Sequence, residues 1–375
     1  MLAGLGQVDP AAWDALVPAD NPFLEHRFLH GLETSNSVGK GTAWQPCHLA
    51  VEADGRLVGA LPLYARADSY GEYVFDWGWA SAAARAGLRY YPKLTTAVPF
   101  TPSSTGRVLG DPGQLPAATE ALRRQLGASG HHVLFCTEAE AQSLAAHGYA
   151  TRLGFQFQWR DDGFGDFDGF LGRFNHKRRK ELLRERRQVR EAGILIQIRR
   201  GDDVSPDDIS ALYGYYRDTI AKHGQHSYLA ERWWREVLPT LGDRLLVAIA
   251  YRHGERVAGA LNFVRGGALY GRYWGCTQDF KGLHFEVCYH ALVEWALGNG
   301  VSLVEAGAQG EHKLQRGFLP RLTYSAHRLA HPGLHDAVAR FCAEEAEQVH
   351  EAVAEYTAHG PFALGRGEDG GAGMS

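Results

Sequence analysis

The stretch Gly254-Glu-Arg-Val-Ala-Gly-Ala-Leu-Asn-Phe263 decides the fold, because a related stretch, Gly55-Arg-Leu-Val-Gly-Ala-Leu-Pro-Leu-Tyr64, occurs earlier in the chain. A short apolar run precedes each copy, over residues 245–250 and 47–52, and a polar turn separates run and copy. Two apolar runs joined by such a turn predict a β-hairpin. The chain is therefore expected to contain the same hairpin twice.

Each hairpin is followed by a segment rich in aromatic residues, 73–77 in the first copy and 269–274 in the second. Both segments are expected to form a third strand. A repeat of this length predicts duplication of a whole domain rather than a solenoid. The length of 375 residues also favours two domains, because one hydrophobic core rarely serves a chain of this size.

Hydrophobic periodicity predicts the order of elements on both sides of the repeat. In the second half it predicts a strand at 194–198, helices at 207–222 and 230–238, the hairpin, the aromatic strand, a helix at 285–297, a strand at 301–305, a helical turn at 313–318, a strand at 322–328 and a helix at 334–356. In the first half it predicts strands at 133–135 and 155–159 and helices at 117–126 and 138–147. The chain is therefore expected to be an α/β (α+β) protein.

Composition restricts the class of protein. With 45% hydrophobic and 22% charged residues and a net charge of -4, the chain has the composition of a globular protein and not of a wholly basic nucleic-acid binder. The five cysteines are odd in number and form no CxxC pair, which argues against a disulfide framework or a zinc site. No apolar run reaches about 18 residues and no signal segment is recognisable, so we expect a cytoplasmic protein without a membrane span.

The run Gly307-Ala-Gln-Gly-Glu-His-Lys-Leu-Gln-Arg-Gly-Phe-Leu-Pro320 is the strongest candidate for a functional site. It follows the predicted strand at 301–305, and loops that leave a rigid sheet often carry binding groups. Its glycines allow a ligand to approach the backbone closely. The alternative is an ordinary turn with solvated charges. The binding candidates in this run are Gln309, Glu311, Lys313 and Arg316, and His312 is a catalytic candidate.

Several segments of the chain together carry a family resemblance: residues 21–24, 90–93, 98–102, 155–159, 273–275, 283–286 with 288–289, and 307–318. They resemble a bacterial family of N-acyltransferases that is described as FemAB-like and belongs to the GNAT superfamily. The resemblance implies two tandem GNAT-like domains, each a mixed, mostly antiparallel sheet flanked by helices. It also implies transfer of an acyl or aminoacyl group, as in the Fem enzymes that use a charged tRNA, to the amine of a small molecule or peptide.

This interpretation divides the chain into four parts. An N-terminal domain is expected at 1–165, a basic connecting helix at 166–192 and a C-terminal domain with the main active side at 193–360. The glycine-rich tail at 361–375 is expected to be disordered, since it has little to bury.

Transfer to an amine requires a base that removes the ammonium proton and donors that stabilise the oxyanion. His284, Glu286, Glu305 and His312 are the candidates, and the sequence does not choose among them. Because His284 and Glu286 are two residues apart on a predicted helix, one is expected to face the cleft and the other to support it. No nucleophile motif is present, so direct attack is expected, with no metal and no tightly bound cofactor.

The acyl donor is less certain from the sequence. Users of acyl-CoA in this superfamily carry an Arg/Gln-x-x-Gly-x-Gly/Ala loop, and residues 276–286 do not fit it. The segment 173–191 carries nine Lys or Arg against three Glu, and could meet a tRNA acceptor stem. It could equally be a solvated interdomain helix. The candidates for donor or substrate contact here are Lys177, Arg178 and Arg179.

Three further residues are candidates for ligand contact. Tyr273 and Trp274 lie on the strand where a GNAT sheet splays, and Lys93 is an expected anion anchor from the first domain. Most other aromatic residues are expected in the core. Two alternative functions remain: an acyl-CoA-dependent N-acyltransferase, and a non-catalytic protein that recognises a cell-wall precursor or peptide.

Overall fold

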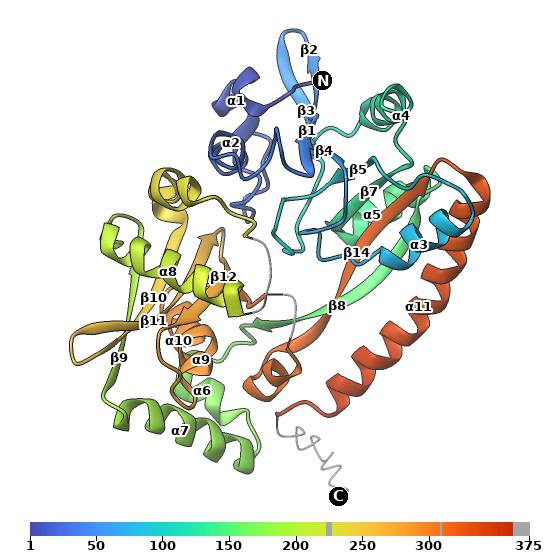
Figure 1. Cartoon of the computed structure of the whole chain (residues 1–375). Helices are drawn as coiled ribbons and strands as arrows, with labels where there is room; N and C mark the ends of the chain where they lie inside the picture. The colour runs from blue at the N-terminus through green and yellow to red at the C-terminus, as the bar shows by residue number, and fades with distance from the viewer. Residues whose placement is uncertain (223–226, 308–309, 363–375) are drawn as a thin grey trace, which may run out of the picture.

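The computed structural model describes residues 1–222, 227–307 and 310–362, and its centre is one large mixed sheet (Figure 1). The strands of this sheet, in spatial order, are β1 (Trp44–Pro46), β4 (Leu63–Arg66), β5 (Lys93–Thr96), β7 (Gly130–Cys136), β14 (Leu319–Leu329), β8 (Ala150–Arg160), β13 (Leu303–Glu305), β12 (Ala268–Cys276), β11 (Glu255–Arg265), β10 (Leu245–Arg252) and β9 (Ile194–Arg200). A second sheet consists of β2 (Leu49–Ala53), β3 (Arg56–Leu61) and β6 (Leu109–Gly110).

Helices flank the sheet on both halves. Those of the first half are η1 (Leu5–Gln7), α1 (Pro10–Asp14), α2 (His26–Thr34), α3 (Trp77–Arg85), α4 (Leu115–Gln125) and α5 (Glu138–Ala145). They are followed by α6 (Phe167–Gly172), α7 (His176–Glu191), η2 (Gly201–Asp203), α8 (Pro206–Lys222), η3 (Trp233–Val237), η4 (Leu238–Arg244), α9 (Leu283–Phe285), η5 (Glu286–His290), α10 (Ala291–Gly298), η6 (Glu311–Arg316) and α11 (Pro332–Ala358). The predicted mixed α/β class, with a large sheet flanked by helices, is confirmed.

The second half contains the predicted elements in the predicted order up to η6. Strand β9, helix α8, the hairpin of β10 and β11, and the aromatic strand β12 follow one another as expected. The helix predicted at 285–297 is continuous with α9 and α10 but contains the π-helical turn η5. Such turns occur frequently at functional sites.

The hairpin is indeed present twice, but its two copies lie in different sheets. Both copies carry a β-bulge, between Val51 and Glu52 in the first and between Ala250 and Tyr251 in the second. In the first copy Pro62 stands between β3 and β4, where the chain passes from the small sheet to the large one. Proline has no N–H group for the ladder, so it suits this point of departure.

The prediction of a strand at 73–77 was wrong. Residues 73–76 form no strand and Trp77 begins α3, while Tyr73 has a positive φ of 60°. We attribute the absence of a strand to Glu72 and Asp76. The carboxylate of Glu72 binds the buried Arg66, and that of Asp76 binds the buried Lys93. Neutralising these cations outweighs the strand propensity of the aromatic residues.

The last strand and the last helix of the chain join the first half. Strand β14 lies between β7 and β8, with Thr323 opposite Gly154, and α11 runs along β8 and β14 (Figure 1). Strand β8 in turn pairs with β13 of the second half through Trp159 and Val304. The division into domains at 1–165 and 193–360 stays a prediction. It does not account for β14 and α11, which follow the second half in the chain but pack against strands of the first half.

A hydrophobic cluster also joins the two halves. Phe23 and Phe28 of the N-terminal segment pack edge to face on Phe263 of β11, with ring centroids 5.3 and 5.8 Å apart. Phe28 also contacts Trp233 at 6.1 Å. At the other end of the chain, Phe362 packs on Phe174, whereas residues 363–375 of the predicted tail lie outside the described residues.

Candidate active site

The candidate site lies where β12 and β13 part. The two strands pair in parallel only as far as Tyr270 and Glu305, and β12 then continues to Cys276 without this partner. The parallel pairs of the described strands are this one and β5 with β7. Side chains from β12, α9, η5 and η6 gather beside the open part of β12.

These side chains form what we call the His284 cluster: Trp274, His284, Tyr289, His312 and Lys313. The ring of His284 is 5.1 Å from Trp274 and 5.8 Å from His312, measured between centroids. The Tyr289 hydroxyl lies 2.9 Å from Nε2 of His312. Four sequence candidates, Trp274, His284, His312 and Lys313, are thus neighbours, although they come from three different elements.

The backbone of the loop makes room for His312. Gly310 has a φ of 116°, and a Cβ atom there would lie 2.4 Å from the His312 ring. Only glycine therefore fits this position without displacing the imidazole.

Both histidines of the cluster favour the neutral form. Burial, followed by the charges of His312, Arg316 and Lys313, lowers the pKa of His284 to about 4. The pKa of His312 is lowered by burial and by Arg316 and Lys313. His312 is exposed, so a neutral imidazole is accessible from solvent at the rim of the cluster.

Lys313 is buried, with 1% of its surface exposed, and its ammonium group donates to the carbonyl oxygen of Gly307 at 2.6 Å. Among the described residues no carboxylate forms an ion pair with it. Burial therefore lowers the pKa of Lys313 to about 8, although nearby Cys288 and Glu305 oppose the shift.

Glu305 ends β13 on the side of the sheet junction. It is buried and accepts a hydrogen bond from Nε2 of Gln158 at 2.7 Å. Burial raises the pKa of Glu305 to about 7, against the opposing effects of the Ser104 backbone N–H and of Arg107. Its carboxyl group thus changes charge near neutral pH.

Arg316 and Glu286 connect the site to helix α7. Arg316 donates to Glu185 of α7 at 2.8 Å and covers the ring of Phe285 at 3.3 Å. Glu286 pairs with Arg186 of α7 at 3.0 Å. His284 and Glu286 therefore have different neighbours, as their spacing of two residues requires.

Two other binding candidates in the second half, Tyr273 and Glu311, make their contacts outside the cluster. Tyr273 points to the opposite face of β12, where it packs on Tyr216 and Trp234. Glu311 accepts a hydrogen bond from the Tyr356 hydroxyl of α11 at 2.5 Å. Gln309 lies outside the described residues.

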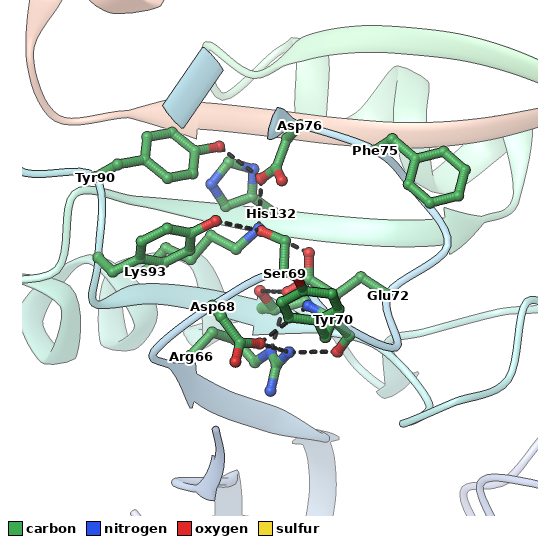
Figure 2. A network of polar contacts seen from close by, with 12 residues as sticks. Arg66, Asp68, Ser69, Tyr70, Glu72, Phe75, Asp76, Tyr90, Lys93 and His132 are labelled. Atoms are coloured by element: carbon green, nitrogen blue, oxygen red, sulfur yellow. Dashed lines mark hydrogen bonds and ion pairs between the residues drawn. The ribbon is translucent and has the colours of Figure 1, made fainter. Parts of the chain in front are cut away.

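Lys93 belongs to a different polar network in the first half (Figure 2). Its ammonium group donates to Ser69 at 2.8 Å, to Glu72 at 2.7 Å and to Asp76 at 2.5 Å, and none of its surface is exposed. Two carboxylates thus already neutralise it. The structure does not bring Lys93 together with the other candidates.

The basic candidates lie along α7. Lys177 and Arg179 are exposed, whereas Arg178 is half-buried and pairs with Glu181 at 2.6 Å. The opposite face of the helix buries Leu182 and Val189.

Sequence reasoning missed several residues at the site, among them Tyr289, Glu185 and Gln158. Tyr289 was part of a segment that carries the family resemblance, but a tyrosine within an apolar helix is typical of a core residue. Glu185 is one of three acids in a basic helix. Its position on the buried side of that helix was the feature of the sequence that could have identified it.

The mixed sheet and its order of elements agree with the acyltransferase class of enzyme that the sequence resemblance implies. The chain belongs to the FemAB-like family, described by its role in peptidoglycan biosynthesis and recognition, which it matches over residues 4–364. The resemblance found in the sequence is thereby confirmed. A comparison with curated proteins finds no match.

Solved structures share the fold at low sequence identity. FemX is 12% identical with a TM-score of 0.54, and the match covers 88% of this chain and 98% of FemX. L-PGS from Bacillus licheniformis is 13% identical with a TM-score of 0.54, and the match covers 92% of this chain and 99% of L-PGS. No helix among the described residues has the length and apolar character needed to cross a membrane.

Proposed function

We propose that this protein transfers an aminoacyl group from a carrier, in our first choice aminoacyl-tRNA, to the amine of a peptidoglycan precursor peptide. The family description and the fold shared with FemX support the class of substrate. The observation that carries the proposal is the buried, unneutralised Lys313 beside the neutral imidazole of His312 at the open end of β12.

In the proposed reaction the acceptor amine attacks the ester carbonyl of the donor directly. His312 takes the proton that the amine loses, with Nε2–H donating to the Tyr289 hydroxyl and the lone pair on Nδ1 accepting. A C–N bond forms, and the charge on the carbonyl oxygen is stabilised by the Lys313 ammonium group. The C–O bond then breaks, and the leaving alcohol takes the proton from His312.

Helix α7 supports a donor rich in phosphate. Glu185 and Arg186 attach one side of α7 to the site, through Arg316 and Glu286. The other side exposes Lys177, Arg179, Lys180, Arg184, Arg187 and Arg190. Exposed cations in a row next to the site can bind the phosphates of a polyanion such as tRNA. Binding of this kind does not depend on the nucleotide sequence.

The first experiment measures transfer of labelled amino acids from a mixed aminoacyl-tRNA pool to a soluble peptidoglycan pentapeptide precursor. We expect His312→Ala to lower kcat by roughly 10²- to 10⁴-fold, the usual contribution of a general base. His359→Ala is the matched control, since His359 is the exposed C-cap residue of α11 and its ring hydrogen-bonds to the Glu355 carbonyl. Equal activity of both variants would refute the role of His312.

A second experiment decides between tRNA and coenzyme A as carrier. Each is titrated at low and near-physiological salt against the native protein and Arg179→Gln/Lys180→Gln. If tRNA binds α7, the double variant loses about two units of the slope of log K against log salt, at roughly 0.7 to 0.9 per contact. Arg232→Gln/Arg235→Gln is the charge-matched control on another exposed surface.

Two outcomes would favour the alternatives. Transfer of the acyl group from acyl-CoA to the amine, with release of coenzyme A as the free thiol and no response to tRNA, would make the protein an acyl-CoA-dependent N-acyltransferase. Tight binding of the precursor peptide without transfer from either donor would make it a recognition protein.

A further inference from the structure

The first half of the molecule contains a cavity at the place that corresponds to the active site of the second half. Strands β5 and β7 pair in parallel, as β12 and β13 do. Helix α4 lies between β5 and β7 in the chain, as α10 lies between β12 and β13, and α5 follows β7 as η6 follows β13. The His284 cluster therefore has a structural counterpart between α4, α5 and β7.

This counterpart is hollow. A cavity of about 380 Å³ lies there, within the usual range for sites that bind small molecules. Its walls are mostly apolar and include Leu61, Val108, Leu115, Val133 and Leu144. Such a surface suits an aliphatic or other apolar body.

A second, polar cavity of about 250 Å³ shares three lining residues with the first: Thr119, His131 and Tyr149. Arg328 of β14 contributes to its wall and lies close enough to His131 that its charge, after burial, contributes to lowering the pKa of that histidine to about 3. His131 is fixed by the Tyr149 hydroxyl at 2.7 Å and the Thr96 hydroxyl at 2.9 Å. The apolar cavity thus adjoins a polar one that contains a cation, and Thr119, His131 and Tyr149 line both.

The charged side chains at the polar end carry a net positive charge, which favours an anionic ligand. Arg123 and Arg124 are already held by Glu120 at 2.8 and 2.7 Å. Arg328 forms no ion pair with a carboxylate in the described part of the chain. One guanidinium group is therefore available to a carboxylate.

We propose that the two adjoining cavities form a second ligand site, which binds an amphipathic monocarboxylate with its chain between α4 and α5 and its carboxylate at Arg328. This site lies in the first half, apart from the His284 cluster. It does not depend on the proposed transfer reaction.

The test is calorimetric titration of the full chain with sodium octanoate, and with 1-octanol as the uncharged probe of equal length. We expect saturable binding of one octanoate per chain, more tightly than octanol. Arg328→Gln should weaken octanoate binding about tenfold, as expected for a hydrogen bond to a charged group, and leave octanol unaffected. Arg340→Gln, an exposed arginine on α11, is the charge-matched control.

A second pair of variants tests the location. Ser143→Trp places a large side chain at an exposed position of α5 that lines the apolar cavity, and should abolish octanoate binding. Gln142→Trp adds the same side chain one residue earlier, at an exposed position that does not line the cavity, and should bind like the native protein. Ala139→Trp provides an independent block at the start of α5, and circular dichroism confirms that each variant is folded.

Three results would overturn the proposal. They are no saturable binding of octanoate to the native protein, octanol bound as tightly as octanoate, and unchanged binding in folded Ser143→Trp and Ala139→Trp.

Discussion

The two buried lysines of this molecule show two different uses of the same side chain. Lys93 in the first half and Lys313 in the second are 0% and 1% exposed. Lys93 meets two carboxylates and a hydroxyl (Figure 2), whereas Lys313 meets one backbone carbonyl. Burial of a cation is costly unless it is paired. The surroundings of Lys93 offset that cost within the fold, whereas no carboxylate of the described residues pairs with Lys313, whose charge we propose to serve a ligand.

The comparison also explains the shape of the loop before α3. Glu72 and Asp76 must reach Lys93, and Glu72 also binds Arg66 at 3.0 Å. The contacts of these two carboxylates therefore determine the backbone path of residues 72–76. The loop after β13 has no comparable set of ion pairs around Lys313 among the described residues, and depends on Gly310 and Gly317 for its turns.

The largest effect expected is the loss of stability in Lys93→Met. This change leaves Glu72 and Asp76 buried with one cation fewer, and breaking a buried pair costs about 3–5 kcal/mol. Urea unfolding measures the difference. The triple variant Lys93→Met/Glu72→Gln/Asp76→Asn should recover part of the loss, and a Lys93→Met protein as stable as the native one would contradict a structural role.

Lys313→Met is expected to show the reverse behaviour. Its stability should change little, because no carboxylate of the described chain is left unpaired, while kcat should fall by roughly 10²- to 10³-fold with the loss of one oxyanion donor. Transfer kinetics and urea unfolding of the same preparation give both numbers. Loss of stability without loss of kcat in the folded fraction would make Lys313 a second structural lysine.

The pH dependence of transfer should distinguish Lys313 from the structural Lys93. Because the proposed role requires charged Lys313, kcat/KM should fall as pH rises through about 8, where this lysine loses its proton. Lys313→Arg, which keeps its charge at alkaline pH, should move that decline upward. A decline at the same pH in both proteins would assign it to another group.

The smallest effect expected is that of Glu305→Gln on the same decline. The negative charge of Glu305 raises the pKa of Lys313, so its removal should move the alkaline decline to lower pH, by less than about one unit. The pH profile of kcat/KM measures this shift even if the rate also changes. A shift to higher pH would show that the two groups do not interact as their positions indicate.

Much of the fold was predictable because its signals are local. Alternation identified β9, an apolar run before a polar turn identified β10, and helical periodicity identified α8 and α11, each within a few residues of its bounds. The position of β14 was not predictable in this way. Periodicity identifies a strand but not its partners, and β14 pairs with β7 and β8, which lie far away in the sequence.

The site was predictable where charges and glycines occur together in one segment. The run from Gly307 contains His312 and Lys313, and both lie in the cluster. Lys93 gave a misleading signal, because a single lysine in the sequence does not indicate that Glu72 and Asp76 will fold back onto it. The role of Tyr289 depends on its contact with His312, which lies 23 residues away in the chain.

The place of β14 has a consequence for how the protein is made. A ribosome synthesises β7 and β8 early, but the strand that separates them ends at Leu329. Until then both strands have unpaired edges, which are templates for aggregation. Pairing over such a separation is also slow. We therefore expect the first half to close only after Leu329 has left the ribosome, so that a nascent chain released before β14 remains a substrate for chaperones.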